Sequence, residues 1–357
     1  MKEARIEKIV NIIHSKGLDA CVIRGMDNIF YLTGFRGSEG ALVVTKGDVL
    51  FITDFRYITH ANEVTKGVKI VELTAKKNVF SEICRQYGIR YMGFDSYHTT
   101  YKIYNTWKDA IQGVELVPLE NEIEEIRKCK DPDEIDIIRK AIEIATNAFV
   151  EVFEKIRPGK TEKEIAYELD YTMRRMGADG PSFDTIVASG VRGALPHAFP
   201  TNKKIEEGET IIIDFGSRVD GYCSDETCTV SVGEINAKIK EIFKIVNDAR
   251  KLGLEKARAG ISVKELDMIV RGFIENAGYG KFFGHGVGHG VGIAVHEAPS
   301  INSSGQGILE ENMVITIEPG IYLPTMGGVR LEDMVLITDE GPKVLTNIRK
   351  EMLQISV

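Results

Sequence analysis

The sequence of 357 residues contains little cysteine and no long hydrophobic stretch. Its five cysteines are odd in number and include no Cys-x-x-Cys pair, which argues against a disulfide framework and favours reduced thiols. No run of about 18 apolar residues predicts a membrane-spanning helix. The first eight residues are too polar for a secretion signal. We therefore expect a cytoplasmic protein with no membrane partner.

The chain also lacks an excess of positive charge and the common nucleotide-binding loops. Its net charge of −8 at pH 7 gives no electrostatic reason to expect a nucleic-acid partner. The glycine-rich segment 284–292 does not satisfy Gly-x-Gly-x-x-Gly, because position 289 is histidine and position 291 is valine. No Gly-x-x-x-x-Gly-Lys phosphate loop occurs either. These absences exclude dinucleotide binding through that motif and phosphate-loop chemistry.

No low-complexity or Pro/Ser-rich linker interrupts the chain, so its domain boundary must be found from periodicity. Short apolar runs alternate with helical spacing in the first third, which predicts an α/β domain. A charge-rich stretch at 122–134 follows, and Pro132 is favourable in the first turn of a long amphipathic helix. We predict an amino-terminal domain at 1–128 and a second, α+β domain at 129–357.

Four acidic residues and one histidine in the last third of the chain are the candidate metal ligands. They are Asp214, Asp225, His289, Glu318 and Glu332. Together they supply about four negative charges, enough to neutralise two divalent cations, and oxygen-rich ligation with one nitrogen suits Mn, Co, Fe or Zn. This donor set is typical of a hydrolase.

The four acids form a repeated pattern. Asp214 and Asp225 stand on either side of the turn-like segment 219–221, which predicts a hairpin, and the second pair of acids repeats the first after 104 and 107 residues. Two helix-start patterns, Thr161-x-x-Glu and Ser262-x-x-Glu, are 101 residues apart. We predict two similar halves related by a pseudo-two-fold axis, which would bring the acid pairs together.

The histidine-rich segment 284–297 is predicted to be extended or loop backbone. His285 and His289 are four residues apart, as in helical zinc motifs, but each glycine at the alternate positions would cost a helix about 1 kcal/mol relative to alanine. In an extended chain the glycines face away from the two histidines, where another backbone or a substrate can approach closely. Three of the seven histidines fall within twelve residues, which favours a functional role.

Five motifs resemble those of the pita-bread metallopeptidases (family M24), and they occur in the family's order. They are 213–216, 222–225, 286–290, 316–320 and 329–333. Residues 28–35 and 50–57 resemble the amino-terminal domain of the proline-specific branch, aminopeptidase P and prolidase. The resemblance implies a small creatinase-like α/β domain followed by a pseudo-two-fold pita-bread catalytic domain.

The resemblance also implies roles for individual residues. Asp214 would bind one divalent metal ion (Mn, Co or Zn), His289 and Glu318 the other, and Asp225 and Glu332 would bridge the two, with a bridging hydroxide attacking the peptide. Glu318, His197 and His296 would be catalytic. The positions matching the proline side of the pocket are His285, Tyr322 and Arg330. For Arg330, a structural ion pair with a ligating carboxylate is an equal alternative.

The substrates implied are short peptides with proline in the second position, and relatives are often homodimers. Prolidases commonly place an arginine a few residues after the histidine that matches His296, but no Lys or Arg occurs between His289 and Glu318. Without that cation a buried terminal carboxylate is disfavoured. We therefore favour an Xaa-Pro aminopeptidase over a strict Xaa-Pro dipeptidase, although Arg36 or another amino-terminal basic residue could supply the charge.

A second departure from the family's pattern lies close to Asp225. Cys228 stands where relatives often have arginine, and we expect a local packing or ion-pair change with intact chemistry. A metal-free creatinase-like enzyme or a non-catalytic peptide-binding protein uses the same scaffold. The full ligand set argues against both, because buried carboxylates that are not neutralised are costly.

Overall fold

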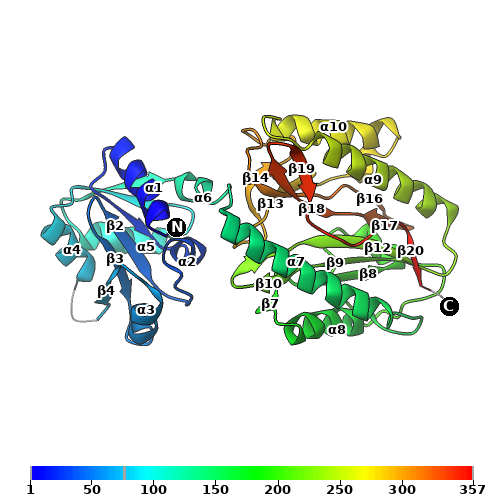
Figure 1. Ribbon diagram of the computed structural model, residues 1–357, viewed down its shortest axis with the longest axis horizontal. Coiled ribbons are helices and arrows are strands. Elements are labelled where there is room, and N and C mark those ends of the chain that lie inside the picture. The colour runs from blue at the N-terminus through cyan, green and yellow to red at the C-terminus, as the bar shows by residue number, and fades with distance from the viewer. Residues whose placement is uncertain (1, 75–77, 356–357) are drawn as a thin grey trace. The chain divides into compact units, whose positions relative to one another are not determined.

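The computed structural model describes residues 2–74 and 78–355. The chain folds into two compact units, Met1–Arg127 and Lys128–Val357 (Figure 1). None of the helices in these described ranges is long and apolar enough to span a membrane. Each unit has its own hydrophobic core, and the two are described separately below.

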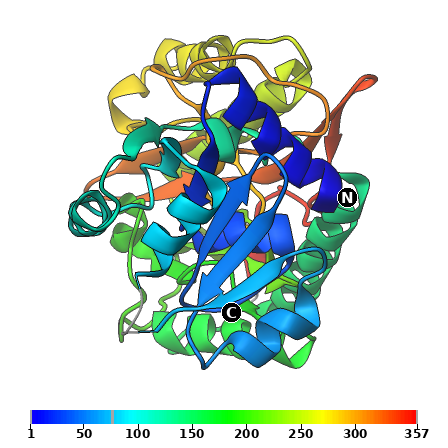
Figure 2. The same cartoon turned by 90° about the vertical axis from the view of Figure 1, so that its left-hand side faces the viewer.

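The first unit is built on a six-stranded mixed sheet in the order β4-β3-β2-β1-β5-β6 (Figure 2). Its strands are β1 (Ala20–Ile23), β2 (Ala41–Thr45), β3 (Val49–Thr53), β4 (Lys69–Glu72), β5 (Tyr91–Asp95) and β6 (Glu115–Leu119). Its helices are α1 (Lys2–Ser15), α2 (Met26–Thr33), α3 (Ile58–Val64), α4 (Val79–Tyr87), α5 (Tyr101–Ala110) and α6 (Glu122–Glu125). The apolar runs that predicted strands are fully buried in β1 and β2.

The first half of the second unit pairs two helices with two small sheets. Its elements are α7 (Pro132–Phe153), α8 (Glu162–Arg175), β7 (Gly180–Pro181), β8 (Ile186–Ser189), the 3-10 helix η1 (Gly190–Ala194), β9 (Thr210–Phe215), β10 (Ser217–Val219), β11 (Tyr222–Cys223) and β12 (Glu226–Val232). The larger sheet has the order β20-β12-β9-β8, in which β20 (Leu353–Ile355) comes from the end of the chain. The smaller sheet has the order β11-β10-β7. Apolar residues of α7 and α8 pack on the larger sheet. The predicted stripe of α7, which includes Ile135, Ile138 and Ile142, is buried.

The second half repeats this plan. Its elements are α9 (Ala237–Lys256), α10 (Val263–Asn276), the 3-10 helix η2 (Gly280–Phe282), β13 (Gly288–Gly290), β14 (Glu297–Ile301), β15 (Val314–Ile317), β16 (Gly320–Leu323), β17 (Gly327–Arg330), β18 (Asp333–Thr338), β19 (Gly341–Val344) and β20 (Leu353–Ile355). The main sheet has the order β14-β13-β15-β18-β19, with β16-β17 as a separate hairpin. Helices α9 and α10 cover this sheet (Figure 1).

The strand pairings confirm the predicted pseudo-two-fold fold. β9 pairs antiparallel with β12, and the hairpin β10–β11 lies between them in sequence. β15 pairs antiparallel with β18, and the hairpin β16–β17 takes the corresponding place. An isolated bridge joins Thr161 to Lys204 in one half, and another joins Ser262 to Ile308 in the other.

The two helix starts differ in one detail from the sequence pattern. Thr161 caps α8 as predicted. Its hydroxyl accepts a hydrogen bond from the Glu164 amide at 3.1 Å, and the Glu164 carboxylate accepts one from the Thr161 amide at 2.7 Å. Ser262 is the residue before α10, but its side chain makes no capping hydrogen bond. The helix boundary was therefore predicted correctly, whereas the second capping box was not formed.

Candidate functional site

The repeated hairpins place the four acidic residues at equivalent points of the two halves. Asp214 lies in β9 opposite Thr227 of β12, and Asp225 immediately precedes β12. Glu318 immediately follows β15 and Glu332 immediately precedes β18. The last residue of β15, Ile317, is paired with the first residue of β18, Asp333. The backbone amide of Glu332 also donates to the Thr227 carbonyl at 3.1 Å. The start of β12 and the start of β18 therefore lie directly beside each other.

The histidine segment is loop backbone around the short strand β13, within the prediction of extended or loop structure, and its glycines allow close packing of neighbouring strands. His289 is the middle residue of β13, which pairs with β14 and β15. A Cβ added to Gly288 would lie 2.0 Å from the Thr316 carbonyl oxygen, and one added to Gly290 would lie 2.2 Å from the Ala298 oxygen. Only glycine fits these two positions, and the close packing turns the His289 imidazole toward the acids.

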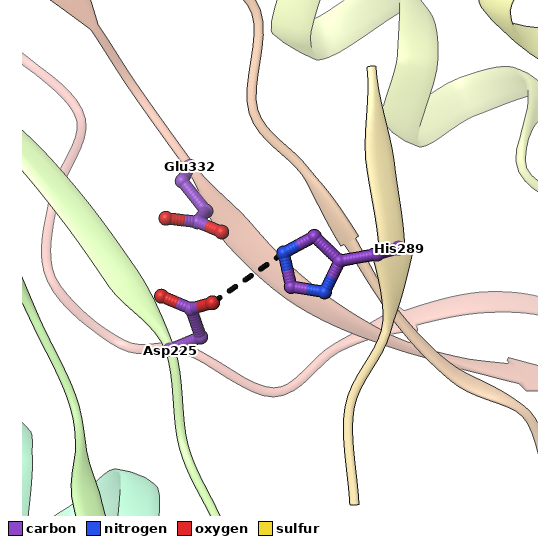
Figure 3. A group of neighbouring side chains, drawn as sticks. All are labelled: Asp225, His289 and Glu332. Atoms are coloured by element: carbon purple, nitrogen blue, oxygen red, sulfur yellow. Dashed lines mark ion pairs between the residues drawn. The ribbon is translucent and has the colours of Figure 1, made fainter. Parts of the chain in front are cut away.

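The five predicted ligands line one cavity of about 430 Å³ in the second unit, which we call the central cavity. Ligand atoms of Asp225, His289 and Glu332 lie within 4.8 Å of one another, and the three side chains point toward a common centre (Figure 3). The Nε2 atom of His289 is 3.4 Å from Glu318 Oε1 and 3.6 Å from Asp225 Oδ2. Asp214 lines the same cavity, with its Oδ2 atom 2.6 Å from Arg330 Nη2.

The donors of this site fit divalent cations. Nδ1 of His289 is 3.1 Å from the Gly290 carbonyl oxygen, so the proton on this nitrogen leaves Nε2 with a lone pair facing two carboxylates. Burial lowers the pKa of His289 to about 4, which keeps the imidazole neutral. Asp214 Oδ1 is buried without a hydrogen-bond partner. The Nε2 lone pair of His289 and the unpartnered Oδ1 of Asp214 are both available as metal ligands, and a bound cation would satisfy both.

Crowded negative charge has a measurable electrostatic signature in the metal-free protein. Burial, followed by repulsion from the other acids, raises the pKa of Asp225 and of Glu332 well above the usual range. Burial also raises the pKa of Glu318 to about 8. At neutral pH Glu318 therefore holds a proton in the absence of metal, and a metal ion bound there would displace it.

We expect the metal-free protein to lose stability as the pH rises from 6.5 to 8. Glu318, with a pKa raised to about 8, keeps its proton in the folded state but loses it in the unfolded state, so raising the pH favours unfolding. His289, with its lowered pKa, has the opposite effect, but only below pH 6.5. Urea unfolding at several pH values, with chelator and with Mn²⁺, measures this. Stability that rises with pH in chelator would contradict the arrangement.

The residues predicted to contact substrate form one connected network. Tyr322 donates its hydroxyl proton to Nε2 of neutral His285 at 2.8 Å and accepts from Arg330 Nη1 at 3.0 Å. Burial lowers the pKa of His285 to about 4, consistent with Nδ1 donating to the Gly286 carbonyl. His285 and Arg330 line the central cavity, whereas Tyr322 contacts them from behind. Its expected role is thus to orient His285.

Arg330 is the buried hub of the site. Besides Asp214 and Tyr322, it donates to the Pro196 carbonyl at 2.9 Å and to the Thr227 hydroxyl at 3.2 Å. The ion pair between Arg330 and a proposed ligand, Asp214, is therefore present, and the Arg330 guanidinium also lines the cavity. Through Pro196 it also anchors the segment that carries His197.

Two buried carboxylates that the sequence did not single out hold the histidine-bearing walls. Glu162 accepts from the backbone amides of Ser189 and Thr201 and from Arg192, which in turn donates to the Phe199 carbonyl at 2.6 Å. This network brackets His197.

In the other half, Asp267 and Arg271 do the same for His285. Asp267 accepts from the Val287 amide at 3.2 Å, and Arg271 donates to the carbonyls of Phe283 and His285 at 3.0 and 2.7 Å. Glu162 is the first residue of α8 and Asp267 the fifth of α10, so the two acids are not equivalent in the repeat and its spacing could not have identified them.

The remaining walls of the central cavity are partly apolar. His197 and His296 line it, and the ring centroid of His296 is 4.3 Å from that of His289. The other lining side chains that the sequence did not reveal are Phe183, Asp184, Ile186, Pro196, Ala198, Phe199, Pro200, Val295, Ser300 and Asn302. Apolar walls with a few polar groups suit a peptide side chain, and the exposed Phe199 marks a side of the cavity that is open to solvent.

Comparison with known proteins identifies both units. Residues 136–339 match metallopeptidase family M24, and residues 5–129 match the creatinase/prolidase N-terminal domain. The Xaa-Pro dipeptidase of Pyrococcus furiosus is 39% identical over 355 residues, covering 99% of this chain and 100% of its own. An Xaa-Pro dipeptidase from Bacillus anthracis superposes with a TM-score of 0.96 at 38% identity, covering 99% and 100% of the two chains.

A structure titled X-Pro aminopeptidase, from Thermotoga maritima, has a TM-score of 0.88 at 38% identity and covers 95% of this chain and 98% of its own. Neighbours titled dipeptidase and aminopeptidase are thus equally similar in sequence. The fold prediction, a creatinase-like domain followed by a pita-bread domain, is confirmed. The chain is a member of metallopeptidase family M24 with a creatinase/prolidase amino-terminal domain.

Proposed function

We propose that this protein is an Xaa-Pro peptidase that uses two divalent metal ions to cleave the bond between an amino-terminal residue and proline. The observation that supports this most directly is the convergence of Asp225, His289 and Glu332 in a cavity also lined by Asp214 and Glu318. Relatives titled Xaa-Pro dipeptidase and X-Pro aminopeptidase support the substrate class. The homodimer and the cytoplasmic location stay predictions.

The five ligands are proposed to hold Mn, Co or Zn. Asp214 would hold one ion, His289 and Glu318 the other, and Asp225 and Glu332 both. Bound divalent cations supply a nucleophile at neutral pH and polarise the scissile carbonyl. Four ionised carboxylates would balance two divalent ions, and the Arg330 guanidinium beside Asp214 would leave the loaded site with about one positive charge.

The protein's own groups would position the peptide and move its protons. Glu318 lines the cavity beside the other proposed ligands, where a carboxylate is placed to shuttle a proton to the leaving proline nitrogen. His197 and His296 line the cavity and can hydrogen-bond the peptide carbonyl as it becomes tetrahedral. His285, oriented by Tyr322, faces the same space and is assigned to the proline side.

Replacing His296 by alanine should lower kcat by about 100-fold, because one hydrogen-bond donor to the developing oxyanion is lost. His296 is proposed to bind substrate and not metal, so the stoichiometry of bound Mn²⁺ should stay at the wild-type value. Steady-state kinetics and metal analysis of the same preparation measure both quantities. A variant that loses its metal would place His296 among the ligands instead.

Between the two substrate classes, the geometry favours an aminopeptidase that accepts longer peptides. Among the described residues that line the central cavity, Arg330 is the only Lys or Arg, and its Nη2 atom is 2.6 Å from Asp214. A dipeptide ends in a carboxylate directly after proline, and no second guanidinium or ammonium lines the described cavity to pair with it. The alternative, a strict dipeptidase, is supported by the similarity to proteins named Xaa-Pro dipeptidase from Pyrococcus furiosus and Bacillus anthracis.

The experiment compares an Xaa-Pro dipeptide with the matching Xaa-Pro-Yaa tripeptide. Release of the amino-terminal residue from both, or from the tripeptide alone, supports the aminopeptidase. Cleavage of the dipeptide alone would support the dipeptidase and indicate a carboxylate partner outside the described cavity residues.

A further inference from the structure

The two proposed bridging acids are each followed by a second acid that faces away from the central cavity. Glu226 follows Asp225 and Asp333 follows Glu332, and neighbouring residues of an extended strand point to opposite sides. Both second acids are nearly inaccessible, with exposures of 2% each, and neither lines the cavity. The repeat therefore buries a second pair of carboxylates directly behind the first.

A single buried lysine reaches both of these carboxylates. The ammonium of Lys350 donates to Glu226 Oε1, lies 3.5 Å from Cys228 Sγ and lies 4.0 Å from Asp333 Oδ1. Its side chain is 2% exposed. Arg250 completes the pairing of Asp333, and Thr346 donates to Asp333 at 2.6 Å. Beside Cys228, the buried negative charge is thus paired by an ammonium supplied from the carboxyl-terminal segment.

The segment that carries Lys350 connects the two halves of the fold. Residues 345–352 leave β19, which belongs to the second sheet, and enter β20, which pairs parallel with β12 of the first sheet (Figure 1). The Leu345 amide donates to the Met334 carbonyl of β18 at 2.8 Å, near the start of that strand. Lys350 therefore sits where the two pseudo-equivalent strands meet, directly behind the point at which the bridging acids leave them.

We propose that Lys350 is a positioning residue that fixes the spacing of Asp225 and Glu332 and thereby sets the affinity of the protein for divalent cations. Its ammonium attracts the acids behind both ligands, so it draws the starts of β12 and β18 together. The inference rests on the proposed function only in taking Asp225 and Glu332 as metal ligands. Residues that orient ligands from behind typically change metal affinity about 10- to 100-fold when removed.

The test measures Mn²⁺ affinity of the full chain by titration calorimetry, alongside urea unfolding. Lys350→Met is expected to weaken Mn²⁺ binding at least about 10-fold and to lower stability, because the Glu226 charge is left buried and unpaired. The double variant Lys350→Met/Glu226→Gln removes that charge and should recover stability while Mn²⁺ affinity stays at least about 10-fold weak. Lys343→Met, an exposed lysine on β19, is the control and should change neither quantity.

Two results would overturn the proposal. One is a double variant that binds Mn²⁺ within about twofold of the wild type, which would reduce Lys350 to a charge partner for Glu226. The other is a wild-type protein that binds no Mn²⁺, Co²⁺ or Zn²⁺. A wild-type protein that binds Mn²⁺ but cleaves no Xaa-Pro peptide would refute the proposed function alone, and the affinity comparison would still decide the role of Lys350.

Discussion

Replacing Asp225 by asparagine is expected to lower Xaa-Pro hydrolysis by about 1000-fold or more, which corresponds to about 4 kcal/mol of transition-state stabilisation. The side chain is buried beside His289 and Glu332 and is proposed to hold both ions. An amide keeps the shape but removes the charge that neutralises the cations. Peptide release at saturating Mn²⁺, together with bound metal per chain, measures the effect.

The same substitution has a second, opposite signature in the absence of metal. Burial and the neighbouring acids hold the pKa of Asp225 well above its usual range, so the charged form destabilises the metal-free fold. Asp225→Asn should therefore be as stable as the wild type in chelator, or more stable, but should lose the stabilisation that Mn²⁺ adds. Unfolded or unstable variant protein in chelator would indicate a structural role instead.

Asp220→Asn is the matched control for this experiment. Asp220 is exposed, five residues away in the β10–β11 turn, and has a positive φ of 47° that asparagine also adopts readily. It should leave both activity and metal content unchanged. Loss of activity in this control would mean that the hairpin itself, and not the charge of Asp225, is being probed.

Placing an arginine in the wall of the central cavity is expected to shift the preference of the enzyme toward dipeptides. Asn302 lines the cavity and lies six residues after His296. A guanidinium there could pair with the terminal carboxylate of an Xaa-Pro dipeptide. Asn302→Arg should raise the ratio of kcat/KM for dipeptide over tripeptide at least about 10-fold, the effect of about 1.4 kcal/mol from one charge-assisted pair.

Asn302→Met separates charge from shape in this comparison. The Asn302 side-chain oxygen accepts from the amide and the hydroxyl of Ser304, both at 2.9 Å, and either substitution removes these bonds. The two variants therefore share the same local cost, and only arginine adds a charge. If Asn302→Met raises the dipeptide-to-tripeptide ratio of kcat/KM as much as Asn302→Arg does, loop geometry controls the preference for peptide length. The absence of a second cation from the cavity wall would then not explain that preference.

The sequence predicted features that depend on local spacing. The non-helical backbone around His285 and His289 followed from alternating glycines, and the paired hairpins followed from the repeat of acids about a hundred residues apart. Both are periodic signals within the chain. The convergence of the five ligands in one cavity could be predicted because a pseudo-two-fold fold brings equivalent strand ends together.

Features that depend on contacts between distant segments were not predicted. An ion pair between Arg330 and a ligating carboxylate was one of two alternatives, but the local sequence does not indicate that its partner is Asp214, 116 residues earlier. Nor does it indicate that Lys350 reaches Glu226, 124 residues earlier. The same holds for Glu162, whose partners include Thr201. The position of Tyr322, which contacts His285 but does not line the cavity, likewise depends on how the β16–β17 hairpin packs. Residue spacing does not specify that packing.

The most direct test of the central claim is release of the amino-terminal residue from an Xaa-Pro-Yaa tripeptide by the full chain, first with chelator and then with Mn²⁺, Co²⁺ or Zn²⁺ restored. We expect no cleavage of the tripeptide with chelator and recovery of cleavage with at least one metal. Neither Asp225→Asn nor His289→Ala should recover cleavage when metal is restored. Cleavage that survives complete metal removal, or full activity in either variant, would contradict the assignment of this cavity as a metallopeptidase centre.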